Sequence, residues 1–307
     1  MKKMVFILFF VVLFIGCGGS GITPKDNSGS SNTPSSSVNE EVSTIVDEHK
    51  DNNTTKEEPS VELIGLAKIQ DLIKKSRDGI LNDVTYICVG DSTRAKSQED
   101  QAHLMFERVK ASLDNYKVNS ILLARGSQEL AHFLEIKLEN GSVRKPTYKD
   151  VIAAIPGTGS HTIIDFALGI NDLWDLHVRS QTDMVDAEAI IKERVLRSIE
   201  LIKEEKPDVN FFLTSPSPLL DWEEGSEVYA KVYKDVTSEL DLPFVNYVDN
   251  IMPPRVQDKN STSIAFEEWY RLEPTDSDPN HRDPIHFSEY GLHKVADYIL
   301  EHILPKD

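Results

Sequence analysis

The stretch Val84-Thr-Tyr-Ile-Cys-Val-Gly-Asp-Ser92 carries the strongest indication of how this chain folds. Its first six residues are mostly β-branched, aromatic or small and apolar, which is typical of a short strand buried on both faces. The Gly-Asp-Ser that follows places a hydroxyl at the carboxyl end of that strand, where parallel α/β sheets bind their ligands. Gly-Asp-Ser also occurs in ordinary turns, so it gains meaning only together with other motifs of the chain.

Two later motifs supply the chemical groups that a serine hydroxyl needs. Gly169-Ile-Asn171-Asp172 follows another apolar run, and Asp283-Pro-Ile-His286 comes just before the last predicted helix. A serine hydroxyl attacks a carbonyl only with help from a neighbouring base. We therefore expect Ser92 to be a nucleophile, His286 its base and Asp283 the carboxylate that orients the base.

Strands alternate with helices over the rest of the folded region. The predicted strands are 84–89, 118–124, 161–168, 209–214 and 244–248. The predicted helices are 63–73, 99–114, 127–139, 147–154, 183–205, 225–239 and 288–303, the last capped by Ser288. This alternation predicts βαβ units and a parallel sheet with helices on both faces.

The chain starts with basic residues, an apolar run at 4–15 and the ending Phe14-Ile-Gly-Cys17. The apolar run is too short to span a bilayer and is typical of a secretory signal peptide. Because the ending resembles a bacterial lipoprotein box, we expect 1–17 to be a lipoprotein signal peptide with Cys17 as the lipidated, palmitate-bearing cysteine. Simple secretion is the alternative. Residues 18–60 are predicted to be a disordered Ser/Asn-rich tether, and 61–307 the folded domain.

Composition restricts the partners of the chain. Its 33 basic and 51 acidic residues give a formal charge of −18, so nucleic acid is not an expected partner. Membrane attachment is expected through the lipid and not through a basic patch. The other cysteine, Cys88, is expected to be a buried core residue. The sequence has no His-Glu-x-x-His and no cysteine cluster, so neither a metal nor a cofactor is expected.

With these motifs the chain resembles the SGNH (GDSL-like) hydrolase superfamily. Gly90-Asp-Ser92 matches the first block of that family, Gly126 the second, Gly169-Ile-Asn171-Asp172 the third and Asp283-Pro-Ile-His286 the fifth. The resemblance implies a flavodoxin-like, three-layer α/β/α fold with a five-stranded parallel sheet. It also implies ester hydrolysis through an acyl-enzyme, with Ser92, Gly126 and Asn171 around the oxyanion. As an alternative, Gly126 is an ordinary turn glycine.

Four further residues are candidates for contact with the substrate. Arg94 would bind an anionic substrate or pair with an acid on the surface. Trp174, just after Asn171-Asp172, would line the cleft or belong to the core. Trp269 and Tyr270 lie in a long polar segment, and such segments are often functional. They would stack on a sugar ring or close the edge of the core.

The spacing of Asp283 and His286 also occurs five residues earlier, in Asp278-Pro-Asn-His281. We favour the second copy because a helix start immediately after His286 would fix its position. His281 is then expected to be a solvated loop residue.

The expected protein is a lipid-anchored serine esterase that hydrolyses short-chain or O-acetyl esters in the bacterial cell envelope. Gly18 after Cys17 favours the outer membrane or the cell surface over the inner membrane. The expected partners are the membrane, through the lipid, and an ester substrate such as an acetylated glycan or a lipid. The alternatives are an O-acyltransferase on the same triad, a lipase, lysophospholipase or thioesterase, and a non-catalytic glycan-binding surface lipoprotein.

Overall fold

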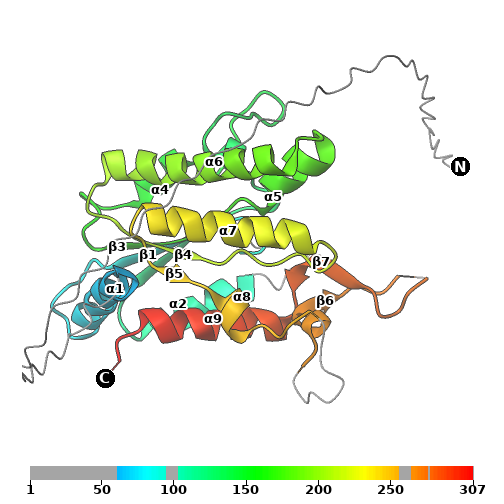
Figure 1. The fold of residues 1–307 in the computed structure, drawn as a ribbon. Helices are drawn as coiled ribbons and strands as arrows, with labels where there is room; N and C mark the ends of the chain where they lie inside the picture. The colour runs from blue at the N-terminus through cyan, green and yellow to red at the C-terminus, as the bar shows by residue number, and fades with distance from the viewer. Residues whose placement is uncertain (1–60, 95–102, 256–263, 276, 307) are drawn as a thin grey trace, which may run out of the picture. The chain divides into compact units, whose positions relative to one another are not determined.

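A five-stranded parallel sheet forms the centre of the computed structural model, which describes residues 61–94, 103–255, 264–275 and 277–306 (Figure 1). The strands are β1 (Thr85–Gly90), β2 (Asn119–Ala124), β3 (Thr162–Ala167), β4 (Asn210–Thr214) and β5 (Phe244–Val245). They are ordered β2-β1-β3-β4-β5 with every neighbouring pair parallel, which is the flavodoxin-like arrangement. The predicted parallel sheet is confirmed.

The strand register decides which loops meet. Gly90 at the end of β1 pairs with Ala124 at the end of β2 and with Ala167 at the end of β3. The three segments that follow these residues therefore leave the sheet side by side at its carboxyl edge. Ser92, Gly126 and Asn171 lie on these segments, one on each.

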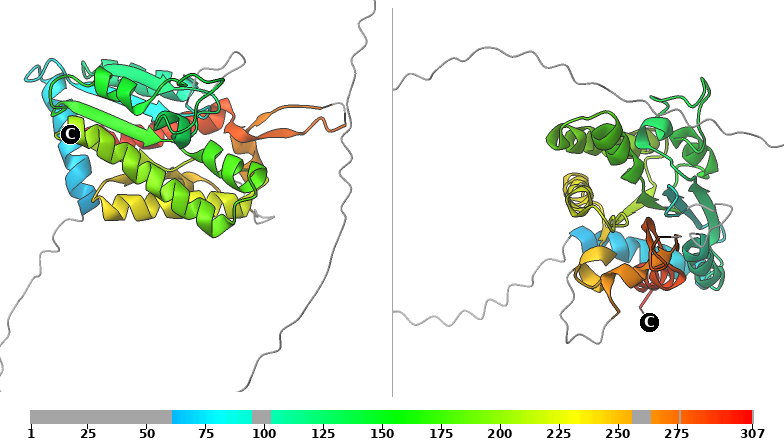
Figure 2. Two further views of the ribbon diagram at one scale, coloured as in Figure 1. Left: turned by 90° about the horizontal axis from the view of Figure 1, so that it is seen from above. Right: turned by 90° about the vertical axis from the view of Figure 1, so that its right-hand side faces the viewer.

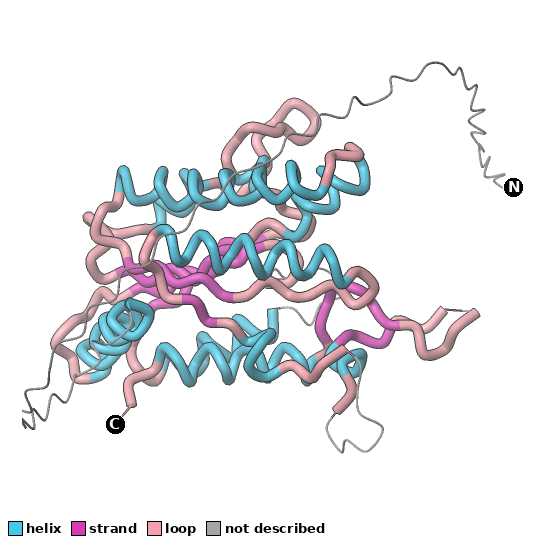
Figure 3. The backbone as a smooth tube through the Cα atoms, in the orientation of Figure 1, coloured by secondary structure: helices cyan, strands magenta, loops and turns pink. Residues whose placement is uncertain are grey.

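Helices cover both faces of the sheet, as the two turned views and the tube drawing show (Figures 2 and 3). One face is covered by α1 (Val61–Arg77), α2 (His103–Asp114), α8 (Tyr247–Ile251) and α9 (Glu289–Ile303). The other is covered by α3 (Leu130–Phe133), α4 (Tyr148–Ala154), α5 (Ile170–Leu173), α6 (Met184–Glu205) and α7 (Glu223–Glu239). The predicted three-layer α/β/α fold is confirmed.

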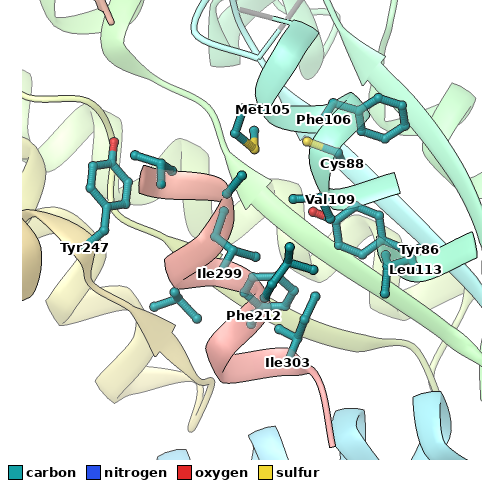
Figure 4. Close-up of a cluster of buried hydrophobic side chains, with 14 of the residues drawn as sticks. Tyr86, Cys88, Met105, Phe106, Val109, Leu113, Phe212, Tyr247, Ile299 and Ile303 are labelled. Atoms are coloured by element: carbon teal, nitrogen blue, oxygen red, sulfur yellow. The ribbon is translucent and has the colours of Figure 1, made fainter. Parts of the chain in front are cut away.

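Side chains of the strands alternate between two hydrophobic clusters, one on each face. Tyr86 and Cys88 belong to the cluster under α1, α2 and α9, whereas Ile87 and Val89 belong to the cluster under α3 to α7. Figure 4 shows Tyr86 and Cys88 among side chains of α2 and α9. Cys88 is fully buried, and burial raises the pKa of its thiol to about 12. The prediction that Cys88 is a core residue is confirmed.

The helix predicted at 127–139 is wrong in its extent, since α3 covers only Leu130–Phe133. The Asp172 carboxylate accepts hydrogen bonds from the backbone N–H groups of Leu130, at 2.5 Å, and Ala131, at 3.3 Å, and this starts the turn at Leu130. Glu135 then takes a left-handed backbone conformation with φ of 61°, which ends the helical path.

The strand predicted at 244–248 is also too long. It stops at Val245 because Asn246 caps α8, with its side-chain oxygen accepting the Asp249 N–H at 3.2 Å. Other caps agree with the prediction: the Ser288 hydroxyl accepts the Gly291 N–H at 3.3 Å at the start of α9.

A second, two-stranded antiparallel sheet was not predicted. It pairs β6 (Tyr270–Leu272) with β7 (Arg282–Phe287), and the single-turn helix η2 (Phe266–Trp269) precedes it. The sequence of β7 reads as a loop because it contains Pro284 and lacks a regular alternation of apolar residues. His286 and Asp283 therefore lie on a strand and not on a short loop.

The predicted signal peptide (1–17), the lipidated Cys17 and the tether (18–60) lie outside the described residues. Within the described ranges, none of the helices is both long enough and apolar enough to span a membrane.

Candidate active site

Ser92 lies in the turn directly after β1. The Asp91 carboxylate accepts hydrogen bonds from the Thr93 N–H and the Thr93 hydroxyl, both at 2.9 Å, and the Arg94 N–H donates to the Asp91 carbonyl at 3.1 Å. The turn thus closes around Asp91, which is buried, and leaves Ser92 partly exposed. This is the arrangement that a serine nucleophile needs at the end of a buried strand.

Asp283 and His286 are in direct contact on β7. The Asp283 Oδ2 atom lies 2.7 Å from His286 Nδ1, and its Oδ1 atom accepts the N–H groups of Ile285, at 2.8 Å, and His286, at 2.9 Å. Burial raises the pKa of Asp283, but these hydrogen bonds outweigh burial and bring the pKa well below its ordinary value. An ionised Asp283 keeps the proton of the ring on Nδ1, which makes Nε2 its basic nitrogen.

The competing pair, Asp278 and His281, is arranged differently. The Asp278 carboxylate accepts the Asn280 N–H at 2.8 Å and forms a local turn. The structure therefore forms the carboxylate–imidazole contact in the copy that the sequence favoured.

The His286 ring is close enough to Asp91, the neighbour of Ser92, for its charge to act on that carboxylate. Burial raises the pKa of Asp91, and the hydrogen bonds from Thr93 and the charge of the nearby His286 ring oppose this shift. Ile285, the neighbour of His286 along β7, also lines the same cavity as Asn171. The segments that carry Asn171 and Ile285, far apart in the sequence, thus meet at one cavity.

Asn171 and Asp172 connect the third sequence motif to the segment that follows β2. The Asn171 side-chain amide donates to the Gln128 carbonyl at 3.0 Å. Asp172 is fully buried, where it receives the two N–H groups at the start of α3 and the Arg194 guanidinium at 2.7 Å. Burial raises the pKa of Asp172 to about 6 despite these partners. Gly169, with φ of 136°, allows the chain to turn from β3 into α5.

Gly126 lies in the turn after β2, and its carbonyl accepts the Arg144 guanidinium at 2.5 Å. A side chain at this position would have open space around its Cβ atom. The role of its N–H in an oxyanion hole stays a prediction.

Arg94 does not face a substrate. Its side chain is buried and pairs with the Asp165 carboxylate on β3. The prediction of an anion-binding residue is corrected here, because a guanidinium that is enclosed under the sheet edge and already neutralised has no contact with the cleft. The alternative of an acid partner is the one observed, although the pair lies in the interior and not on the surface.

Trp269 and Tyr270 are buried as well, so the prediction that they stack on a sugar ring is corrected. Trp269 packs edge-on against the rings of Phe287 and Tyr290. Tyr270 is fully buried, and its hydroxyl donates to the Pro218 carbonyl at 2.6 Å. Both residues close the core beneath the ribbon of β6 and β7.

Trp174 lines a cavity of about 520 Å³ next to Asn171, and its side chain is 48% exposed. It meets Trp222 edge to face, with 6.3 Å between the ring centroids. The cavity is walled mainly by apolar side chains with two charged ones, and its lining residues are Ile170, Asn171, Trp174, Arg179, Leu219, Asp221, Trp222, Pro284 and Ile285.

The sequence analysis did not identify the residues that line the cavity together with Trp174. It also did not identify one hydrogen-bond partner of the Asp283 carboxylate. Trp222 and Leu219 come from the turn after β4, which carries no motif. Arg271 donates to Asp283 Oδ2 at 2.8 Å, on the same oxygen that contacts His286. An arginine next to Trp269 and Tyr270 was visible in the sequence, but only the pairing of β6 with β7 places it against Asp283.

The similarity of this chain to known proteins is found among solved structures. No protein-family model matches the chain, and no curated protein was found to be similar to it. The chain is similar to solved structures that are described as esterases, lipases or lipolytic proteins of the G-D-S-L family. They include an acetyl xylan esterase, AlAXEase, with a TM-score of 0.47 and 14% identity over 72% of this chain and 100% of that one.

Two more of these similar structures are bacterial proteins. A lipase/acylhydrolase from Enterococcus faecalis has a TM-score of 0.46 and 17% identity over 73% of this chain and 98% of that one. A member of the lipolytic protein G-D-S-L family from Veillonella parvula has a TM-score of 0.47 and 14% identity over 71% of this chain and 96% of that one. At such identities the activity has to be inferred from the side chains of the site.

Proposed function

We propose that this chain is a serine ester hydrolase of the SGNH type that works through an acyl-enzyme. The observation that supports this most is the 2.7 Å contact between Asp283 and the His286 ring, near the turn that carries Ser92. An ionised carboxylate on Nδ1 orients the imidazole and stabilises its protonated form, which is what a base for a serine hydroxyl requires.

In the proposed mechanism, Ser92 Oγ attacks the ester carbonyl carbon while its proton passes to His286 Nε2. The negative carbonyl oxygen is stabilised by the Ser92 N–H, the Asn171 side-chain amide and the Gly126 N–H. The imidazolium then gives its proton to the leaving alcohol as the ester C–O bond breaks. A water then attacks the acyl-enzyme as it loses a proton to His286, and His286 returns that proton to Ser92 Oγ as the acyl–serine bond breaks and the acid leaves.

The substrate that we propose is a short-chain ester, such as an acetyl group, on a ring-bearing alcohol such as a sugar. A cavity of about 520 Å³ offers more room than an acetyl group fills, so we assign it to the alcohol. Trp174 gives it an exposed aromatic face, and Arg179 and Asp221 supply polar groups for hydroxyls.

A lipase or lysophospholipase is the second candidate function. Ile170, Leu219 and Ile285 give the same cavity an apolar wall that would also suit a long acyl chain.

The test is hydrolysis of p-nitrophenyl esters of increasing chain length by the full-length chain, beside its Ser92→Ala variant. We expect turnover to be fastest with acetate and to fall by roughly 10⁴-fold or more in Ser92→Ala. A preference for long chains would support the lipase, and transfer of acetyl to an added sugar acceptor would support an O-acyltransferase. Activity retained in the folded variant would contradict the mechanism.

Failure of the wild-type chain to react with a fluorophosphonate, together with a lack of turnover, would support a non-catalytic binding protein. Reaction of the wild-type chain, with label on Ser92 and none on Ser92→Ala, would support the assigned nucleophile independently of any choice of ester.

We also propose that the chain is lipid-anchored through Cys17 in the bacterial cell envelope, at the outer membrane or cell surface. The support is the sequence of 1–17, with its basic start, apolar run and terminal cysteine. In cells, Cys17→Ser should move the protein from the membrane fraction to the soluble fraction. A variant that stays with the membrane would contradict the anchor.

A further inference from the structure

The strongest unexplained feature is an ion pair buried beneath the turn that carries Ser92. The Arg94 side chain is 4% exposed and the Asp165 side chain 0%, and the guanidinium donates to Asp165 Oδ2. Asp165 also accepts the Tyr86 hydroxyl at 2.8 Å and the Thr214 hydroxyl at 2.5 Å. This carboxylate thus joins β1, β3 and β4 from the middle of β3.

Arg94 reaches this carboxylate by passing back under the end of β1. Its guanidinium lies 3.4 Å from Cys88 Sγ, and Cys88 is the register partner of Asp165. Gly90 makes room for the stem of the arginine, since a Cβ atom on Gly90 would lie 2.6 Å from Arg94 Cγ and 3.1 Å from the Ala167 carbonyl oxygen. The glycine of the Gly-Asp-Ser motif is therefore required by the packing of Arg94.

The turn that contains Ser92 is consequently tied at both of its ends. Asp91 closes it from within through Thr93, and Arg94 connects its last residue to β3. Asn171, the proposed oxyanion donor, lies on the segment that follows β3. The ion pair thus links the nucleophile turn to the strand that leads to Asn171.

A gain in folding stability does not explain why this buried pair is charged. Transfer of both ions out of water is costly, and apolar residues of similar volume in place of a buried pair are often neutral or stabilising. What an apolar pair lacks is direction, because the Arg94 Nη1 group points at both Asp165 Oδ2 and Cys88 Sγ, and hydrogen bonds weaken steeply when their angle changes. The feature is thus suited to fixing an angle between two backbone segments.

We propose that Arg94 is a positioning residue, which through Asp165 sets the orientation of the Ser92 turn relative to β3 and Asn171. This inference rests on the proposed hydrolase function. Arg94 makes no contact with substrate, so its loss should affect the chemical step and leave substrate binding nearly unchanged.

The test compares the full-length wild-type chain with R94M/D165N, using p-nitrophenyl acetate, urea unfolding and the rate of labelling by a fluorophosphonate. The double variant removes both charges, and its Asn keeps an oxygen acceptor for the Tyr86 and Thr214 hydroxyls. We expect kcat and the labelling rate to fall by about 100-fold, because a displacement near 1 Å has this effect, while KM changes by less than about threefold. Unfolding should occur at a urea concentration close to that of the wild-type chain.

The matched control is R108M/D297N, which removes an exposed ion pair between α2 and α9 and should retain the wild-type kcat. Wild-type kcat in a folded R94M/D165N would overturn the proposal, and so would a rise in KM at constant kcat. If R94M/D165N does not fold, R94K decides, since it keeps the charge without the planar guanidinium that points at Asp165 Oδ2 and Cys88 Sγ. We expect about tenfold lower kcat in R94K at unchanged KM, and wild-type kcat would overturn the proposal. A wild-type chain that neither turns over esters nor labels would instead show that the hydrolase function itself has failed.

Discussion

The two halves of the candidate site are built on different supports. Ser92 and Asn171 follow β1 and β3, whose six residues each are buried, whereas Asp283 and His286 lie on β7, where four of six residues are partly exposed. The carboxylates of the two halves respond in opposite ways. The pKa of Asp172 is raised to about 6 by burial, and the pKa of Asp283 is lowered by its hydrogen bonds.

This difference shows how one site obtains both rigidity and a base. Desolvation dominates at the fully buried Asp172 of α5, whose carboxylate holds the start of α3 and Arg194 through several hydrogen bonds. On the peripheral ribbon, the Asp283 carboxylate accepts four hydrogen bonds through its two oxygens, so it stays ionised and is available to orient an imidazole.

The largest expected effect is the loss of activity on replacing His286, which replacement of His281 should not cause. His286→Ala should lower kcat by about 10³- to 10⁴-fold because the serine loses its base, whereas His281→Ala should leave kcat unchanged. Steady-state kinetics on p-nitrophenyl acetate measure both. Equal losses in the two variants would mean that the ribbon acts through its fold and not through one imidazole.

On the sheet side, Asn171→Ala should lower kcat by about 10²- to 10³-fold, since one oxyanion donor is lost. Asn115→Ala, which removes an exposed amide at the end of α2, is the matched control and should behave as the wild-type chain. Near wild-type kcat in a folded Asn171→Ala would remove this residue from the oxyanion site.

The raised pKa of Asp172 predicts a stability that falls with rising pH. Its proton is bound more tightly in the folded chain than in the unfolded one, so its contribution is present below about pH 4 and is lost as the pH rises through 6. Relative to Asp172→Asn, the free energy of unfolding of the wild-type chain should decrease between pH 4 and 7, on the order of 3 kcal/mol. Urea unfolding at each pH measures it. A difference independent of pH would contradict the assignment.

Asp283 predicts the opposite slope. Because its pKa is lowered in the folded chain, its contribution is present above the unfolded value of about 4 and is lost as the pH falls below it. Relative to Asp283→Asn, the wild-type chain should gain roughly 1–2 kcal/mol of unfolding free energy between pH 3 and 5. The same urea series gives this value, and slopes of equal sign at Asp172 and Asp283 would refute the contrast between the two halves.

The smallest effect concerns the cavity beside both halves. Trp174→Ala should raise KM for an acetylated sugar by about tenfold with little change in kcat, because a stacking face that binds the alcohol is lost. Ile80→Ala, at an even more exposed apolar residue before β1, should leave KM unchanged. A loss confined to kcat would place Trp174 at the reacting atoms instead.

The fold was largely predictable because its elements have strong local patterns. The apolar runs predict β1, β3 and β4 within about two residues of their ends, and helical spacing predicts α6, which extends from Met184 to Glu205. The failures have tertiary causes: Asp172 starts α3 late, and β7 acquires its partner β6 only in the folded chain.

The residues of the site divide in the same way. Ser92, Asp283 and His286 were predicted from motifs, and the structure joins the last two, with the charge of His286 acting on Asp91 beside Ser92. The sequence left two roles open for each of Arg94, Trp269 and Tyr270: contact with the substrate, or an acid partner for Arg94 and closure of the core edge for the two aromatic residues. All three are buried, and exposure is a property of packing that no local pattern contains.

The sequence by itself determined the types and order of the chemical groups, since Gly-Asp-Ser, Gly-x-Asn-Asp and Asp-x-x-His each sit at the end of a strand or before a helix. Only the tertiary structure decided which Asp–His copy forms a contact, which acid neutralises Arg94 and which segments wall the cavity. The physical reason is the separation along the sequence of the residues that interact. Strand and helix patterns reflect neighbours a few residues apart, whereas Arg94 and Asp165, or Asn171 and Ile285, meet because the register of a parallel sheet and the docking of a ribbon bring distant segments to one edge.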